Sequence, residues 1–513
     1  MKHKDVTQLP RQNGSTPQNA SCDLGERCHS RRGIFIVLLC GMMLTIACEN
    51  AIGGNFSITN ITPNGDDIEL EILYTTSFRT NYTELNIFST VDLVNPDWVR
   101  EAIVQVDTGA TSVTWTHVDA TEVSRGYACG NNDFDTDGDR MSDDWESVNG
   151  LDKDDASDGT EDADNDSFLN VYEYIHNTDP QDASSEPSGT HFVADTGSHT
   201  SPFDTWAKAA TNIQSALDVA TDAYDIVLVE EGTYQGPLNK NLTFPANAIM
   251  LSSRDSSTNC VIDCQNNGRG LVFDNYHERT TVINAIGITR GLTDRGGGIF
   301  CTNASPSIVA CRVWDSTATE YGGGMYFRLS SARIADSTVE ANTANLDGGG
   351  IDFDLANIDI ENCFVVDNSS VTNEGAGITA WNSIATLRNC TVAGNSQTAG
   401  DGAGIVFGGT YSTGLVQNCI VWTNSPTQLS NLSSNGLLTV TYSDVQYGFT
   451  GTGNISDFPA FTSGYKISST SPCIDAGTNN LLLVDFEGDA RFDDTSATNA
   501  VAIWDIGADE YTP

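Results

Sequence analysis

Residues 322–350 read GGGMYFRLSSARIADSTVEANTANLDGGG, a stretch that begins and ends with the same glycine triplet. The triplet occurs five times, twice with alanine at its centre, and its starts are separated by 26, 26, 27 and 27 residues. The five copies begin at Gly296, Gly322, Gly348, Gly375 and Gly402. A fixed period of this length is typical of a solenoid, in which each repeat packs only on its neighbours. Function is therefore expected on a long, repetitive surface.

Each repeat contains two segments that predict short strands. In the first, apolar residues alternate with other residues after the glycines, so one face of the strand is expected to be buried. This inward register begins with Ile299, Met325, Ile351, Ile378 and Ile405. The second strand carries a valine in every copy, at Val313, Val339, Val365, Val392 and Val421.

A polar residue follows each of these valines by three positions: Ser316, Asn342, Asn368, Asn395 and Asn424. Because stacked coils bring equivalent residues to about 4.8 Å apart, such asparagines can form a ladder of side-chain amides. The glycines are expected at corners where a Cβ would clash or φ is positive. The repeat predicts a right-handed parallel β-helix, because an array of helical repeats would need two amphipathic helices per unit. No triplet has the helix and Lys-Ser/Thr pair of a phosphate-binding loop.

The chain is strongly acidic. It has 513 residues, with 24 Lys and Arg against 69 Asp and Glu, and its formal net charge is −45. This length allows several domains. Such a surface repels nucleic acid and anionic membranes, so we expect no nucleic acid partner. We expect a monomer.

Residues 1–47 are predicted to be a signal peptide with a long polar N-terminal region. The apolar run from Ile34 to Ile46 has about 13 residues, whereas a membrane-spanning helix needs about 20. Ala47 and Cys48 resemble a bacterial lipoprotein cleavage site, at which Cys48 would be acylated to form a lipid anchor. Ordinary cleavage after Ala47 remains an alternative. Export to the extracellular space or the bacterial cell surface is expected in either case.

The chain contains 13 cysteines, and export would permit disulfides. Cys260 and Cys264 are the best candidates for a local bridge. Four other cysteines fall on the inward register of the repeats, where a column of buried thiols is the simpler expectation. These four are Cys311, Cys363, Cys390 and Cys419. The sequence has no Cys-x-x-Cys pair or histidine cluster with zinc-ligand spacing.

Two acidic segments carry the spacing of a calcium-binding loop. The first, residues 135–146, reads DTDGDRMSDDWE, and the second, residues 162–173, reads DADNDSFLNVYE. Calcium prefers six to eight hard oxygen ligands, which this spacing can supply from one short loop. The predicted ligands of the first loop are Asp135, Asp137, Asp139, the carbonyl of Met141, Asp143 and Glu146. Those of the second are Asp162, Asp164, Asp166, the carbonyl of Phe168, Asn170 and Glu173.

Both loops lack the usual glycine at position 6, where Arg140 and Ser167 stand. The segment 131–186 resembles thrombospondin type 3 and dockerin-like calcium repeats, a resemblance that implies a linker stiffened by calcium. Residues 51–130 precede it with alternating runs such as DIELEILYTT, which predict a small β-sandwich-like domain. This domain loosely resembles the modules that exported bacterial proteins place ahead of calcium-rich linkers. A spacer role is favoured for it, and carbohydrate binding is the alternative.

The predicted β-helix spans residues 190–456. Near its start, four apolar residues at helical spacing predict a helix that plugs the open end of the solenoid. They are Ile213, Ala216, Leu217 and Ala220. From Thr190 to its end, the chain resembles the pectin-lyase-like β-helix superfamily. Residues 457–513, with SPCIDAG and DIGADEY, resemble the closing module of secreted bacterial β-helix proteins.

The superfamily resemblance implies polysaccharide lyases and glycoside hydrolases, so we searched for their motifs. The RxPxxR pattern of pectate lyases is absent. The Asn-Thr-Asp of polygalacturonase-type hydrolases occurs at residues 177–179, outside the β-helix. His277 is the only histidine in the repeats, and a lone histidine is more often a surface or core residue than a base. The sequence therefore identifies no catalytic residue.

Strand alternation places two columns of residues on the outward face after each triplet. One column is Phe300, Tyr326, Asp352, Thr379 and Val406, and the other is Thr302, Arg328, Asp354, Trp381 and Gly408. Aromatic rings beside arginine and carboxylates suit a sugar-binding face. We therefore predict glycan binding at Tyr326, Arg328, Asp352, Asp354 and Trp381. The alternatives are an ordinary exposed or loop-covered sheet, and an acid–base role for Asp352 and Asp354.

Together these features predict an exported protein that binds or scaffolds polysaccharide or a cell-surface glycan. A polysaccharide lyase or glycoside hydrolase is the second interpretation, and a structural adhesin is the third.

Overall fold

The computed structural model divides the chain into two compact units, residues 1–134 and 135–513. In the first unit it describes the strands alone. In the second it describes residues 141–511 except 154, 156–157, 167, 275, 373, 400–401, 403, 479–481, 483–484 and 488–503. Among the helices in these ranges, none has the length and apolar composition needed to cross a bilayer.

The first unit consists of antiparallel strands in two sheets, ordered β1-β7-β4-β5 and β2-β3-β6. The strands are β1 (Ile36–Leu39), β2 (Phe56–Asn64), β3 (Asp67–Tyr74), β4 (Glu84–Thr90), β5 (Val99–Gln105), β6 (Ser112–His117) and β7 (Ser124–Gly130). This architecture agrees with the all-β domain predicted for residues 51–130. Strand β1 lies within the predicted signal peptide, and Cys48 lies outside the described residues.

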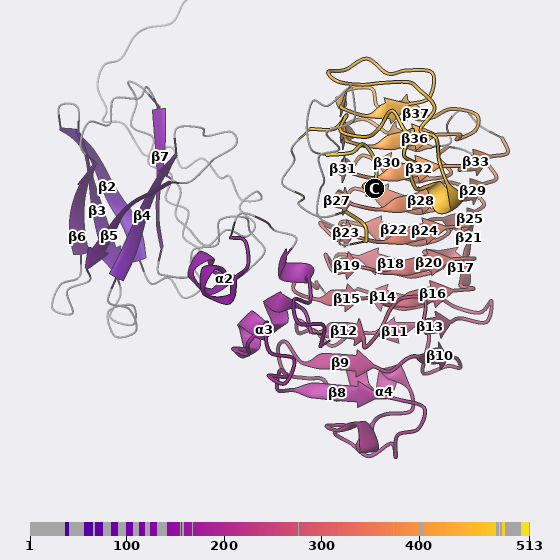
Figure 1. Cartoon of the computed structure of the whole chain (residues 1–513), viewed down its shortest axis with the longest axis horizontal. Coiled ribbons are helices and arrows are strands. Elements are labelled where there is room, and N and C mark those ends of the chain that lie inside the picture. Colours follow the sequence, from indigo (N-terminus) through magenta and orange to yellow (C-terminus); the bar gives the residue numbers. More distant parts are fainter. Residues whose placement is uncertain are drawn as a thin grey trace, which may run out of the picture. The chain divides into compact units, whose positions relative to one another are not determined.

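The second unit is a parallel β-helix, as the repeat predicts (Figure 1). Its ten-stranded sheet contains β8 (Thr190–Val193), β9 (Ile226–Val229), β12 (Met250–Ser253), β15 (Val282–Asn284), β19 (Ser307–Val309), β23 (Arg333–Ala335), β27 (Asn357–Glu361), β31 (Ile384–Arg388), β35 (Thr413–Gln417) and β38 (Leu438–Thr441). Its nine-stranded sheet contains β10 (Gly232–Tyr234), β13 (Cys260–Asp263), β16 (Gly287–Thr289), β20 (Arg312–Trp314), β24 (Thr338–Glu340), β28 (Phe364–Val366), β32 (Thr391–Ala393), β36 (Ile420–Trp422) and β39 (Asp444–Val445).

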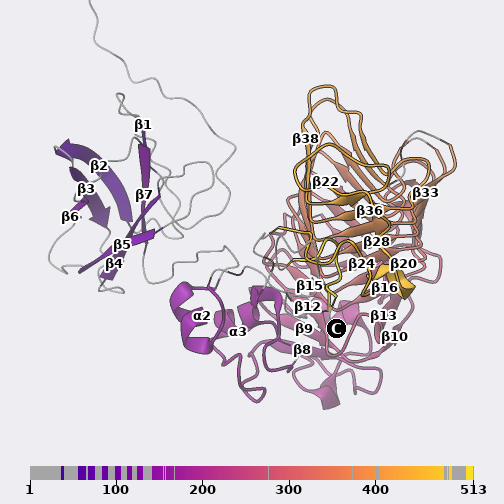
Figure 2. The ribbon, with the colours of Figure 1, turned by 45° about the horizontal axis from the view of Figure 1, so that its top comes forward.

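Two further sheets complete the coils. The eight-stranded sheet contains β11 (Leu242–Thr243), β14 (Leu271–Phe273), β18 (Ile299–Thr302), β22 (Met325–Arg328), β26 (Ile351–Asp354), β30 (Ile378–Trp381), β34 (Ile405–Gly408) and β37 (Leu429–Asn431). The five-stranded sheet contains β17 (Leu292–Arg295), β21 (Thr317–Tyr321), β25 (Thr343–Ala344), β29 (Ser369–Ser370) and β33 (Ser396–Gln397). Neighbouring strands belong to successive coils, so equivalent residues of each repeat stack in columns (Figure 2).

The short helices lie outside the repeats. They are α2 (Asp143–Asn149), η1 (Asp158–Thr160), α3 (Asn170–His176), η2 (Trp206–Lys208), α4 (Ile213–Leu217) and η3 (Ser463–Tyr465). The side chains of Ile213, Ala216 and Leu217 in α4 are fully buried and belong to the same apolar cluster as the interior of the coils. The predicted capping helix is therefore confirmed.

The interior of the coils has the predicted register. All five residues that begin the first strands and all five valines of the second strands are buried in one continuous cluster. Four cysteines line this interior, and each thiol donates a hydrogen bond of 3.4–3.6 Å to a carbonyl of the preceding coil. They are Cys311, Cys363, Cys390 and Cys419. Burial raises the pKa of Cys311 to about 12, which keeps that thiol neutral and unreactive.

The predicted bridge between Cys260 and Cys264 is wrong. Both cysteines are free, and both side chains are buried in the interior. Cys260 begins β13 and Cys264 directly follows it. Residues four apart along an extended chain are separated by about 13 Å, and a disulfide requires Cα atoms less than about 7 Å apart.

An asparagine ladder runs along one corner of the coils, as predicted. The Nδ2 of Asn342 donates to the Oδ1 of Asn368 at 3.1 Å, Asn368 donates to Asn395 at 3.0 Å, and Asn395 donates to Asn424 at 2.9 Å. The third glycine of the last four triplets makes room for this ladder. A Cβ at Gly350 would lie 2.9 Å from the Asn368 Nδ2 and 2.7 Å from the carbonyl oxygen of Gly377.

The described part of the module 457–513 packs on the outward side of the nine-stranded sheet. Ile467, Cys473 and Ile506 pack against Ile420 and Trp422 of β36. Two further residues of the module, Phe486 and Ala508, extend this contact toward earlier coils through a second cluster with Phe364 and Val366 of β28. The module therefore covers one side of the solenoid, a position that its sequence did not indicate.

Replacing Asn395 with alanine should destabilise the β-helix. The substitution removes the acceptor of both the Asn368 backbone N–H and its Nδ2. Because a buried polar group without a partner costs about 1–3 kcal/mol, we expect the free energy of unfolding to fall by about 3 kcal/mol in chemical denaturation. Exposed Asn357 provides the control, and Asn357→Ala should change this free energy little. Equal effects of both substitutions would contradict a structural role for the ladder.

Stability should also depend on Asp444, which begins β39 and is fully buried. Burial raises its pKa from 3.8 to about 7. Between these values the unfolded chain has lost the proton that the folded chain retains, so stability contributed by this group falls as pH rises from about 4 to 7. Asp444→Asn should remove this part of the pH dependence in denaturation experiments between pH 4 and 8. If the free energies of unfolding of the variant and the wild type differ by the same amount at every pH in this range, Asp444 does not cause the pH dependence.

Candidate functional site

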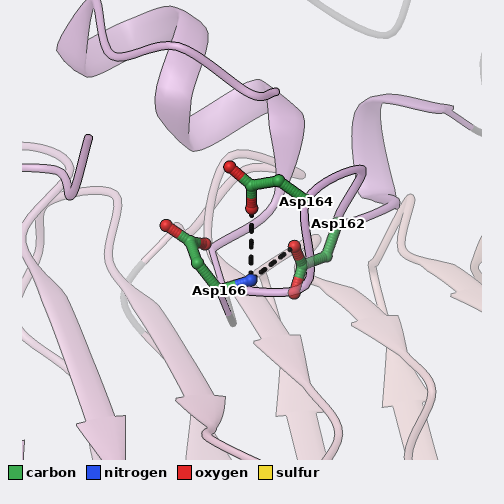
Figure 3. Close-up of side chains that lie close together, drawn as sticks. All are labelled: Asp162, Asp164 and Asp166. Atoms are coloured by element: carbon green, nitrogen blue, oxygen red, sulfur yellow. Dashed lines mark hydrogen bonds between the residues drawn. The ribbon is translucent and has the colours of Figure 1, made fainter. Parts of the chain in front are cut away.

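The second calcium-type loop brings three carboxylates together. Oxygen atoms of Asp162, Asp164 and Asp166 all lie within 4.8 Å of one another (Figure 3). The loop is shaped by its own side chains, because the backbone N–H of Asp166 donates to Asp162 Oδ1 at 3.1 Å and to Asp164 Oδ1 at 3.2 Å. The N–H of Phe168 donates in turn to Asp166 Oδ1 at 2.9 Å. The predicted spacing therefore gives a compact acidic loop.

Glu173, the last predicted ligand of this loop, lies on α3. Its side chain is 0% exposed, and neither carboxylate oxygen has a hydrogen-bond partner. Burial, followed by the negative charges of Asp166 and Asp164, raises its pKa to about 8. Burial and neighbouring carboxylates also raise the pKa of Asp166 to about 6. A buried carboxylate without donors requires a positive charge to be stable in ionised form.

Asn170 joins the loop to α3. Its Oδ1 accepts from the N–H of Ala163 at 3.2 Å, and its Nδ2 donates to the carbonyl of Asp158 at 2.8 Å. The side chain of Phe168, by contrast, is buried away from the carboxylates in an apolar cluster. The predicted roles of Asn170 and of the Phe168 carbonyl as ligands stay predictions.

The first loop is described only in part. Asp135, Asp137 and Asp139 lie outside the described residues, so their predicted role stays a prediction. Met141 and Glu146 are buried, and Asp143 begins α2, whose N-terminal cap is Ser142. The structure therefore places Glu146 on a helix that follows its loop, as it places Glu173 on α3.

The segment that carries both loops packs on the β-helix. Tyr172 donates from its hydroxyl to the carbonyl of Thr280 at 3.1 Å, and the His176 ring contacts the carbonyl of Tyr224 at 3.1 Å. The Asn177 of the Asn-Thr-Asp sequence ends α3 in a left-handed conformation, which identifies it as a helix cap. The described part of the predicted linker is thus part of the β-helical unit.

One outward column on the eight-stranded sheet has the predicted arrangement. Arg328, Asp354 and Trp381 are neighbours in register, and Arg328 Nε lies 3.0 Å from Asp354 Oδ2. Trp381 is 42% exposed. A Cβ at Gly408, the next residue in the column, would lie 2.4 Å from the indole carbons, so the ring rests on that glycine. The column presents an aromatic ring beside an ion pair.

The expectation that Tyr326 and Asp352 face solvent is wrong. They are only 2% and 3% exposed, and side chains of the five-stranded sheet cover Tyr326. Arg295 lies over the Tyr326 ring at 5.6 Å, and Tyr321 packs beside it. Burial, with the charges of Asp347 and Asp354, raises the pKa of Asp352 well above its ordinary value. An enclosed Asp352 is poorly placed to meet a polysaccharide.

His277 is a core residue. It is buried against Phe244 and Phe273, and burial lowers its pKa.

Sequence reasoning missed a different feature, the outward apolar residues of the first coils. The signal was the unbroken apolar run Ile226–Val229, since such a run indicates a strand buried on both faces.

No protein-family model matches the chain, and no curated protein matches it. A similar solved structure is titled "Crystal structure of pectate lyase Pel9A". It shares 13% sequence identity with this chain, with a TM-score of 0.31, and the match covers 63% of this chain and 96% of that chain. The assignment of the β-helix rests on the pairing of its strands.

Proposed function

We propose that the loop 162–173 binds a calcium ion. The observation that carries this proposal is Glu173, whose two buried oxygens have no donor although three other carboxylates lie nearby. A divalent cation would stabilise all four carboxylates at once, whereas their mutual repulsion opposes folding without it.

The donor set fits calcium by its chemistry. Asp162, Asp164 and Asp166 would supply carboxylate oxygens, Phe168 a backbone carbonyl and Asn170 a side-chain oxygen. Glu173 would close the site with both of its oxygens. These are all hard oxygen ligands, the type that calcium prefers, and no thiol or imidazole is among them.

We propose as a second function that the β-helix binds polysaccharide through the column Arg328, Asp354 and Trp381. The supporting observation is the exposed indole beside the ion pair, because pyranose rings pack on aromatic faces while charged groups bond hydroxyls. Extracellular or cell-surface localisation and a lipid anchor at Cys48 belong to the same proposal. Lyase or hydrolase activity and a structural adhesin role remain the alternatives, and product release from bound glycans would favour an enzyme.

Glu173→Gln should abolish most calcium binding by the full chain. The substitution keeps the shape of the side chain and removes its charge, so we expect at least a roughly 10–100-fold loss of affinity by calorimetry. Asp179→Asn is the matched control, because Asp179 is an exposed carboxylate outside the loop. It should bind calcium as the wild type does. If Glu173→Gln binds calcium with wild-type affinity, the proposed site is wrong.

Trp381→Ala should weaken binding to the best ligand found on a glycan array by about 1 kcal/mol, the scale of a lost aromatic contact. Since the ring is on the surface, the melting temperature should change little. Tyr447→Ala is the control, because Tyr447 is an exposed aromatic residue outside this column. Equal affinities of the Trp381 variant and the wild type would place the glycan site elsewhere.

A further inference from the structure

One outward column of the ten-stranded sheet changes from apolar to polar and charged residues along the solenoid. Register pairs Ile226 with Met250 and Met250 with Val282, so the first coils present an apolar column. The same column continues through Ser307, Arg333 and Asp359. The apolar outward residues of these first coils indicate that another part of the chain covers them.

The segment with the calcium-type loops supplies this cover. Figures 1 and 2 show α3 beside β9 and β12. The buried cluster at this contact joins side chains of the segment to outward side chains of the sheet. The segment contributes Met141, Phe168, Leu169, Val171 and Tyr172, and the sheet contributes Phe192, Ile226, Leu228, Met250, Val282 and Val309.

Within the segment, residues that contact the sheet alternate with proposed ligands. Phe168 packs on the sheet through its side chain, while its carbonyl is a proposed ligand. Tyr172 packs on the sheet and bonds to Thr280, while the adjacent Glu173 is the buried carboxylate. Tyr172 and Glu173 lie on the same helical turn of α3. Docking of this helix through Tyr172 therefore fixes the position of Glu173 relative to the loop.

We propose that calcium binding and docking of residues 141–182 onto the β-helix are one linked equilibrium. In it, Tyr172 and Leu228 act as positioning residues for the ion although neither is a ligand. The inference rests on the proposed calcium site. Reciprocity follows from linkage: if the ion favours the docked segment, contacts that favour docking must raise calcium affinity by the same factor.

This linkage has a consequence for the β-helix. Without the ion, the repelling carboxylates of the loop weaken docking, and the apolar column under α3 becomes accessible more often. With the ion, the segment closes over the first coils and protects them. Calcium would then control the N-terminal part of the solenoid from a site outside its coils.

The test measures calcium affinity by calorimetry on full-length variants of Leu228, a residue of the β-helix. Leu228→Ala removes packing under α3 and should weaken calcium binding roughly tenfold, within the usual range of coupling between sites. Leu228→Met keeps most of the volume and should restore affinity. Phe364→Ala is the control, because Phe364 is an outward residue buried under the C-terminal module. It should lower the melting temperature measured in chelator and leave calcium affinity unchanged.

Tyr172→Phe provides a second variant if Leu228→Ala does not fold. It removes the hydrogen bond to Thr280, keeps the aromatic ring, and should still weaken calcium binding. The linkage is overturned if Leu228→Ala or Tyr172→Phe folds and binds calcium with wild-type affinity while Glu173→Gln has lost it. Normal binding by Glu173→Gln would overturn the calcium site itself, so the two failures are distinguishable.

Discussion

Successive coils of this solenoid approach to the spacing that backbone hydrogen bonds between parallel strands impose, about 4.8 Å. The side chain at each position must therefore fit beside the equivalent side chain of the next coil at that distance. The ladder Asn342–Asn368–Asn395–Asn424 meets this requirement with amides that donate to the next coil and accept from the previous one. The glycines beside it leave the space that those amides occupy. Hydrogen bonding between the parallel strands of successive coils thus accounts for both the spacing of the coils and the repetition of equivalent residues in the sequence.

Because the coils repeat, each outward column can be polar or apolar independently of the interior. At two places, other parts of the chain cover apolar outward residues: Ile226 and Met250 lie under α3, and Phe364 lies under the C-terminal module. Elsewhere the columns carry charges in pairs, such as Arg328 with Asp354 and Arg333 with Glu361. The outward surface therefore combines covered apolar residues with paired charges.

In this acidic chain, the loop 162–173 groups four carboxylates, those of Asp162, Asp164, Asp166 and Glu173. A carboxylate as deeply buried as Glu173 is costly when ionised, and three further carboxylates increase that cost. Arginines offset similar costs on the β-helix, as Arg333 and Arg388 do for Glu361, whose pKa they lower against the opposing effect of burial. For Glu173 we propose that a metal ion takes this part. Under this proposal, arginine side chains meet the requirement on the solenoid, and an ion would meet it beside the solenoid.

The sequence by itself determined the features that depend on period and local spacing. The inward register, the asparagine ladder, the capping helix α4 and the grouping of Asp162, Asp164 and Asp166 all follow from residues a fixed number of positions apart. Only the tertiary structure decided what lies over each outward face. Tyr326 and Asp352 alternate with interior residues as expected, yet both are buried, and Arg295 and Tyr321 of the five-stranded sheet cover Tyr326. Alternation shows on which side of a strand a residue lies, but the covering segment is chosen by long-range packing, which no local pattern encodes.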